Sequence, residues 1–140
     1  MSIAASLAPV FAQVLLVVIL SILMAKRCAA AVRSNEVKTS ALVGDANAWP
    51  KPARLAANAF HNQFEFPILF YVLTILAVVA KKADVLFVWL AWLFIATRYL
   101  HAFIHVTSNR MPHRFYAFIA GVAFLTVMWI RFAVQILVTG

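Results

Sequence analysis

Acidic residues are scarce in this sequence. Asp and Glu together number 4, against 12 Lys and Arg, and all charged residues make up only 11% of the chain. Hydrophobic residues make up 66%, and the mean hydropathy is +0.96. This composition excludes a water-soluble domain, because 140 residues folded in water need far more polar surface. The net charge of +8 does not indicate a nucleic-acid partner, because the cations lie at the ends of apolar runs and not on one face of a soluble scaffold.

Cysteine is limited to Cys28, which excludes an intramolecular disulfide. Long polar segments are also rare, and 33–50 is the only long one between apolar runs. The rest of the chain forms four apolar runs, each long enough to cross about 30 Å of hydrocarbon as a helix. The sequence therefore predicts an all-α integral membrane protein, a single domain over 1–140 built as an antiparallel bundle of four transmembrane helices. The expected helices span about 3–32, 53–80, 83–107 and 112–138.

The basic residues indicate how these helices cross the membrane. Lys26 and Arg27 follow the first apolar run and do not precede it, so we expect that run to remain as a span and not to be cleaved as a signal peptide. Lys81 and Lys82 stand alone near the second loop, and Arg98 and Arg131 are taken as embedded. Most other cations flank the first and third loops, which predicts that these loops are cytoplasmic and that both termini lie on the opposite side. The cations on the cytoplasmic side are Lys26, Arg27, Arg33, Lys38, Lys51, Arg54, Arg110 and Arg114.

Polar and ionisable residues recur on one face of the second span. At about 100° per residue their spacing places them within roughly a third of the helix circumference. The third and fourth spans carry similar residues toward the same side. The second span contributes Arg54, Asn58, His61, Asn62 and Glu65, the third Arg98, His101 and His105, and the fourth Arg110, His113 and Arg114.

Glu65 lies roughly 16 Å along the second span from Arg54, well inside the hydrocarbon, at about 1.5 Å rise per residue. A carboxylate at that depth costs a few kcal/mol or more unless it is paired or hydrated. We therefore expect a polar cavity in which Glu65 meets His101, His105 or an arginine. A simpler interpretation is that these Asn and His residues only join helices through hydrogen bonds and that Arg54, Arg110 and Arg114 mark the membrane interface. Pro67 is expected to be a tolerated kink.

Two motifs resemble a known family. Asn62 and Glu65 match an Asn-x-x-Glu signature followed by Pro67, and Arg98, His101 and His105 occupy the positions of an Arg-x-x-His-x-x-x-Tyr pattern. With Arg110, Pro112 and Arg114, they make nearly the whole chain similar to the MAPEG family, the membrane-associated proteins in eicosanoid and glutathione metabolism. The resemblance implies a homotrimer in membrane lipid that binds glutathione between adjacent subunits, near the cytoplasmic face. It also implies a hydrophobic small molecule or lipid that approaches from the bilayer.

The resemblance implies a role for each polar residue. Arg114 would be catalytic, because a guanidinium favours the thiolate of glutathione over the thiol. Glu65 would bind the ammonium of glutathione, Asn62 its peptide groups, and arginines its carboxylates. The residues expected to bind this co-substrate are Asn62, Glu65, His101, His105, Arg98, Arg110, His61, Arg54 and Asn58. The implied function is a membrane-bound glutathione transferase or peroxidase that conjugates or reduces lipophilic electrophiles.

Four positions depart from the family pattern and leave alternatives open. His61 replaces an Arg, His105 replaces a Tyr, and Phe115 and Phe118 stand where prostaglandin-synthesising relatives carry hydroxyls. One alternative is a non-catalytic lipid-binding member of the family. Another is a site for zinc or iron, because His61 and Glu65, like His101 and His105, are four residues apart.

Overall fold

The computed structural model describes residues 2–38, 40 and 45–139. Its elements, in chain order, are α1 (Ile3–Arg33), η2 (Ala46–Ala48), α2 (Lys51–His61), η3 (Asn62–Phe64), α3 (Phe66–Val79), α4 (Val85–Val106) and α5 (Met111–Thr139). Four stretches are long and apolar enough to cross a membrane: α1, the segment Lys51–Val79, α4 and α5. The prediction of four spanning segments in an all-helical chain is confirmed.

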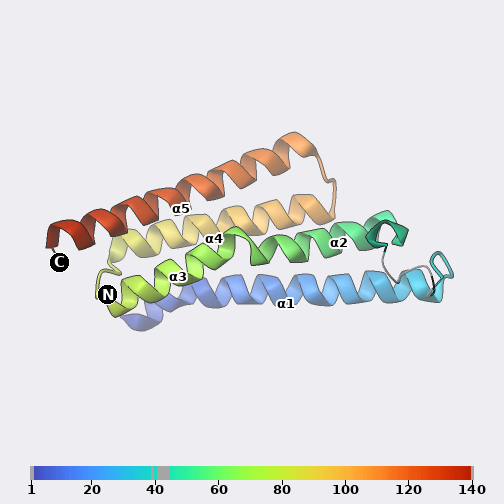
Figure 1. Cartoon of the computed structure of the whole chain (residues 1–140), viewed down its shortest axis with the longest axis horizontal. Coiled ribbons are helices and arrows are strands. Elements are labelled where there is room, and N and C mark those ends of the chain that lie inside the picture. The colour runs from blue at the N-terminus through green and yellow to red at the C-terminus, as the bar shows by residue number, and fades with distance from the viewer. Residues whose placement is uncertain (1, 39, 41–44, 140) are drawn as a thin grey trace.

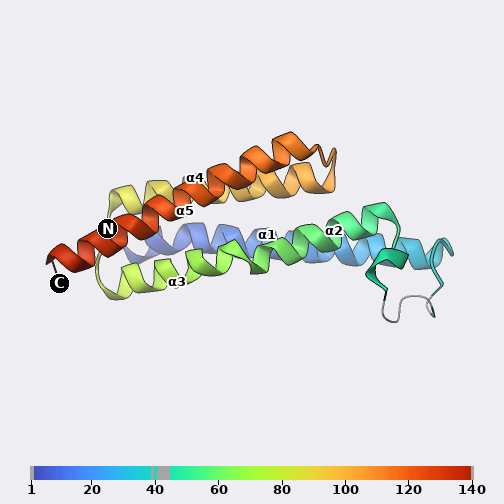
Figure 2. The same ribbon diagram turned by 45° about the horizontal axis from the view of Figure 1, so that its top comes forward.

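The spans run antiparallel along one long axis (Figure 1). The first turn of α1, the α3–α4 turn and the last turn of α5 lie at one end of the bundle, and the end of α1, the start of α2 and the α4–α5 turn lie toward the other. Helix α1 packs against α2, α3 and α4. Helix α5 packs against α4 and, to a smaller extent, against α3. Figure 2 shows α2 and α3 following one another along α1.

Local chemistry sets where the helices begin and end. The hydroxyl of Ser2 accepts a hydrogen bond from the backbone N–H of Ala5 at 3.2 Å, which caps the start of α1. Beyond the ends of α1, α3 and α4, the residues Asn35, Lys81 and Asn109 have positive φ, the left-handed conformation that commonly terminates a helix. Short turns follow α3 and α4 and bring their neighbours back antiparallel.

Two groups of buried apolar side chains hold the bundle together. The larger joins α3, α4 and α5, with Phe70, Phe94 and Leu125 at its centre. The smaller joins α1, α2 and α4 and includes Leu20 and Ala59. Many other large apolar side chains remain exposed, as expected for helices that face lipid.

Small residues allow α2 to lie close to α1. Ala53, Ala56 and Ala59 recur every three residues on one face of α2, and each is at most 1% exposed. Small side chains at this spacing let two membrane helices approach closely. The opposite face of α2 carries the exposed side chains of Asn58 and His61, so packing against α1 turns the polar residues away from it.

The second span is not the single helix expected over 53–80. It breaks into α2, the single turn η3 and α3, with Glu65 outside both helices at φ −99° and ψ −105°. Pro67, near the start of α3, explains the break: it has no N–H to donate to Gln63, four residues earlier, and its ring clashes with that carbonyl. The residue expected to be a tolerated kink therefore interrupts the helix.

The α3–α4 turn is tied to α5 by a charged group. The carboxylate of Asp84 accepts a hydrogen bond from the backbone N–H of Phe87 at 2.9 Å and pairs with the guanidinium of Arg131. This hydrogen bonding to Arg131 holds the pKa of the Asp84 carboxyl below its ordinary value. It is the one salt bridge that the structure contains within residues 2–38, 40 and 45–139.

The first prediction concerns the close contact of α4 and α5 at Gly121. A Cβ added there would lie 2.7 Å from the Oγ1 of Thr97, whose hydroxyl donates to the carbonyl of Phe94 at 2.6 Å. We expect Gly121→Ala to lower the free energy of unfolding by about 1–3 kcal/mol, the usual cost of overpacking. The double variant Thr97→Ala with Gly121→Ala should recover much of this loss in thermal unfolding in detergent. Wild-type stability of Gly121→Ala would contradict the packing described here.

The second prediction concerns Asp84 and pH. Because the folded-state pKa of Asp84 is lowered, its pairing stabilises the protein above the unfolded pKa and is lost as pH falls through the folded pKa. Asp84→Asn retains a capping side chain but loses the charge, so it should destabilise by about 0.5–1 kcal/mol near pH 7. The difference in unfolding temperature should shrink below about pH 4. The control is Asp45→Asn, which changes an exposed helix cap that forms no ion pair with a described residue. If the difference in unfolding temperature between wild type and Asp84→Asn stays constant with pH, the ion pair is not its cause.

Candidate functional site

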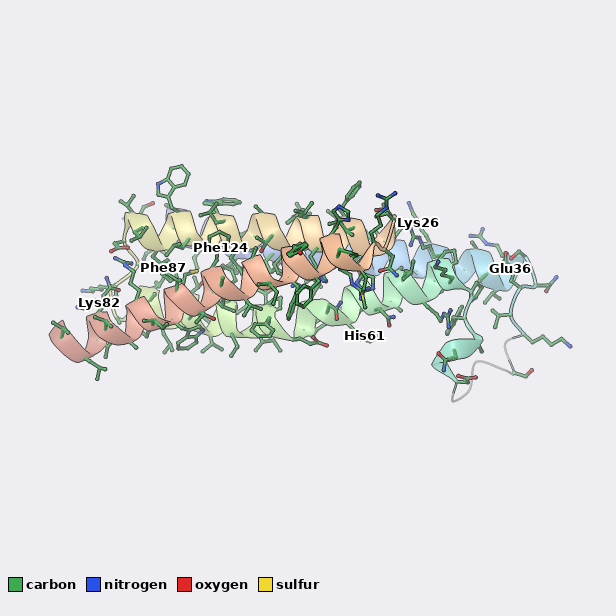
Figure 3. The ribbon with its side chains drawn as sticks, turned by 90° about the horizontal axis from the view of Figure 1, so that it is seen from above. Lys26, Glu36, His61, Lys82, Phe87 and Phe124 are labelled. Carbon is green, nitrogen blue, oxygen red and sulfur yellow. The ribbon has the colours of Figure 1, made fainter. Side chains whose placement is uncertain are left out.

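The break in the second span forms one wall of a cavity of about 460 Å³. The first turns of α5 form the opposite wall, and α4 forms the floor. Its volume falls within the range of about 300–1,000 Å³ typical of small-molecule sites. Figure 3 shows His61, on this wall, between the Glu36 and Lys82 ends of the molecule. The lining residues are Asn58, His61, Asn62, Glu65, His101, His105, Met111, Arg114, Phe115 and Phe118.

The side chain of Asn62 links the break to α4. Its Nδ2 lies 3.3 Å from Nδ1 of His105, and its backbone carbonyl accepts a hydrogen bond from the guanidinium of Arg98 at 3.3 Å. Arg98 is only 3% exposed, so its charge is held inside the bundle next to a carbonyl that the broken helix leaves available. The break and the buried arginine therefore stabilise each other.

A pair of glutamines fixes the same segment from the other side. Gln63 and Gln13 are both at most 1% exposed, and Nε2 of Gln13 donates a hydrogen bond to Oε1 of Gln63 at 3.0 Å. Gln63 also donates to the carbonyl of Ala59 at 2.9 Å, which fastens η3 to the end of α2. Sequence reasoning missed this pair, although a lone Gln13 within an apolar run was a signal of a buried partner.

Arg114 holds its positive charge at the mouth of the cavity. Its guanidinium donates to Oδ1 of Asn109 at 2.7 Å and contacts the sulfur of Met111 at 3.0 Å. Both partners are neutral, and in the described part of the chain Arg114 has no carboxylate partner. An arginine positioned by neutral groups keeps its charge available for an anionic ligand.

Glu65 also lines the cavity, and its side chain is exposed in the single chain. The expected direct pairing of Glu65 with His101, His105 or an arginine is absent within 4.0 Å in the part of the chain that the structure describes. A smaller cavity of about 40 Å³ lies between Glu65 and the buried residues Arg98 and His101. This cavity is large enough to hold water between Glu65 and the two buried side chains. Among the described residues, Nε of Arg98 and Nδ1 of His101 have no hydrogen-bond partner.

Two of the expected arginines lie apart from this cavity. Arg54 lines a second cavity of about 460 Å³, which shares Asn58 and His61 with the first. Arg110 is exposed in the α4–α5 turn and lines neither cavity, although its carbonyl accepts the hydrogen bond from the backbone N–H of Arg114 at 3.1 Å. The structure thus gathers seven of the ten expected site residues around one cavity, with Arg98 beside it and Arg54 and Arg110 farther out.

The aromatic residues divide between the cavity and the packing. The ring of Phe118 lies 6.1 Å from that of His101, and Phe115 is exposed at the cavity wall. The hydroxyl of Tyr99 donates instead to the carbonyl of Ala12 at 2.7 Å, so Tyr99 joins α4 to α1 and faces away from the site. The cavity therefore has an apolar side on α5 and a polar side at the break.

The histidine spacing does not produce a metal site. Within residues 2–38, 40 and 45–139, no three or more His, Cys, Asp and Glu side chains are arranged to hold a metal ion. The rings of His101 and His105 lie perpendicular, 5.8 Å apart, and the helix break separates His61 from Glu65. The four-residue spacing that suggested paired ligands on the second span is therefore not a helical spacing.

Comparison with known proteins agrees with the motifs. The family described as the MAPEG family matches residues 6–134 of the 140-residue chain. No curated protein and no solved structure matches significantly. The match covers the second and third spans, most of the first and fourth, and all the residues that line the cavity. The chain therefore belongs to the MAPEG family, as a multi-pass membrane protein related to glutathione or eicosanoid metabolism.

Proposed function

We propose that the protein is a membrane-bound glutathione transferase or peroxidase, which uses the thiolate of glutathione to conjugate or reduce lipophilic electrophiles. One observation carries the proposal: Arg114, Glu65 and Asn62 line the same cavity. Glutathione has a thiol, two carboxylates, an ammonium and two peptide groups. A guanidinium, a carboxylate and an amide around one cavity complement those groups.

Arg114 is the proposed catalytic residue. A thiol with a pKa near 8.5 is mostly protonated at neutral pH, and a nearby guanidinium favours the thiolate. In conjugation, the thiolate sulfur forms a bond to an electrophilic carbon, the leaving group departs with the electron pair, and the thiol proton passes to water. In peroxide reduction, two glutathione molecules are oxidised to the disulfide while the peroxide is reduced to an alcohol and water.

The other residues complete the proposed site. Glu65 would bind the ammonium, and Asn62 would bind the peptide groups. His101 and His105 would form the polar wall between them. Asn58 and His61, which both lie at the exposed edge, would bind one end of the tripeptide. Arg98 would support Asn62 through the bond to its carbonyl. Arg54 and Arg110 lie outside this cavity, so a direct role for them would require a ligand that extends beyond it.

The exposed edge of the cavity supports a homotrimer. Glu65 and His61 are exposed in the single chain, although the break lies within a spanning segment, and a polar edge at that depth requires protein or water beside it. A neighbouring subunit would cover this edge, and the electrophile would enter along Phe115 from the bilayer. The excess of cations at this end supports an orientation in which the first and third loops lie in the cytoplasm.

A lipid-binding protein without turnover is the second candidate. Phe118, which packs near His101, offers no hydroxyl to a thiol, so the wall facing the sulfur is partly apolar. Turnover distinguishes the two candidates. Purified protein that retains lipid but does not consume glutathione with any electrophile tested would support the binding protein.

The third prediction is that Arg114→Ala removes thiolate formation. Glutathione titrated into wild-type protein should give a thiolate absorbance near neutral pH, and Arg114→Ala should abolish it. We expect kcat/KM to fall about 10²-fold, as for removal of one charge-stabilising donor. Arg33→Ala, which removes an exposed arginine whose side chain donates to the carbonyl of Ala29 in its own helix, is the control. An unchanged thiolate signal in Arg114→Ala would remove that residue from catalysis.

The fourth prediction concerns Glu65 and the ammonium of glutathione. Glu65→Gln should raise the KM for glutathione about tenfold or more, because it removes a charge-assisted hydrogen bond. The same change should have little effect on glutathione whose amino group is acetylated, which already binds weakly to the wild type. Equal losses for both forms of glutathione would show that Glu65 acts through the fold and not through the ammonium.

A further inference from the structure

The second cavity, next to the proposed glutathione cavity, brings together three separate segments. The turn η2, the first two turns of α2 and the α4–α5 turn all contribute to its wall. Its volume of about 460 Å³ is large enough for a substantial ligand group. The lining residues are Asn47, Trp49, Lys51, Arg54, Leu55, Ala57, Asn58, His61 and Asn109.

Among the described residues that line this cavity, the charged ones are positive, and the nearby carboxylate of Asp45 accepts a hydrogen bond from the backbone N–H of Asn47 at 2.8 Å. Lys51 and Arg54 line the cavity, and no Asp or Glu does. Neither cation has a carboxylate within 4.0 Å in residues 2–38, 40 and 45–139, where Asp84 and Arg131 form the only ion pair. Amide side chains add neutral hydrogen-bond donors around the cations. Such a wall complements a phosphate, which carries negative charge on several acceptor oxygens.

The position of the cavity matches the headgroup region of a bilayer. Lys51 is the first residue of the second spanning segment, and Arg54 lies about 4.5 Å deeper along the helix. Trp49 precedes the helix, and tryptophan side chains are enriched where the membrane meets water. Trp49 and Leu55 also give the cavity an apolar surface beside its cations. A free inorganic ion would not contact that apolar surface, whereas the glycerol and upper acyl chain of a lipid would pack against it.

We propose that this cavity binds the phosphate headgroup of an anionic membrane phospholipid, with Lys51 and Arg54 at the phosphate and Trp49 and Leu55 against the adjoining apolar part. The site is separate from the proposed thiol site, although the two share Asn58 and His61. Asn109 also lines the lipid cavity while it accepts the hydrogen bond from Arg114 at 2.7 Å. The lipid site thus adjoins the α4–α5 turn that holds Arg114.

The test measures lipid retention without glutathione, so its result does not depend on the proposed enzyme activity. Protein purified from nanodiscs of phosphatidylglycerol and phosphatidylcholine in equal amounts is examined by native mass spectrometry. Wild type should retain phosphatidylglycerol in preference to phosphatidylcholine. The double variant Lys51→Gln with Arg54→Gln should lose roughly tenfold to thirtyfold of this preference, the effect expected for two cations near a membrane surface.

A matched double variant, Lys26→Gln with Arg33→Gln, removes two cations in the last turns of α1 that do not line the cavity. It should retain the wild-type preference. An equal loss in both double variants would overturn the proposal, because it would show general attraction between cations and lipid. If the double variant of Lys51 and Arg54 does not fold, the wild-type measurement tests the proposal by itself. Equal retention of phosphatidylglycerol and phosphatidylcholine by the wild type would overturn the proposal. Displacement of all phosphatidylglycerol by millimolar inorganic phosphate would also overturn it, by showing a site for a free anion.

Discussion

The structure depends on what a backbone can do inside a membrane without water. Each N–H and C=O in the hydrocarbon must find a partner within the protein, and Pro67 removes one such partner in the second span. The chain responds by closing η3 and restarting as α3. The carbonyl of Asn62, next to Gln63 at the break, accepts a hydrogen bond from Arg98. One imino acid thus places a polar segment in the bundle and gives a buried arginine its partner.

The residues around the break also have hydrogen-bond partners within the protein. The side chain of Gln13 reaches from α1 to that of Gln63, and His105 reaches from α4 to the side chain of Asn62, so neighbouring helices on two sides hold the side chains of the break in place. The alanine face of α2 brings α1 close enough for the first of these contacts. The polar side chains then point toward α5, whose first turns complete the cavity.

The sequence predicted the number of spans and most of the site, because apolar length and polar periodicity are local properties of the chain. It did not predict the break, since Pro67 can either kink or interrupt a helix and the outcome depends on the partners available to the freed groups. Arg54 lies in α2 one turn before Asn58, and the structure places it in the second cavity and not in the main one. The pairing of Gln13 with Gln63, 50 residues apart, and that of Asp84 with Arg131 are tertiary contacts, which no local pattern encodes.

The pair of Asp84 and Arg131 bears on how the chain enters the membrane. An arginine within an apolar segment raises the cost of inserting that segment, and Arg131 lies in the fourth span. Its partner is made earlier, in the turn that follows α3, so the anion is already present when the last helix is synthesised. The anion that neutralises Arg131 therefore belongs to the part of the chain that precedes the fourth span, and docking of that span against α4 brings the two charges together.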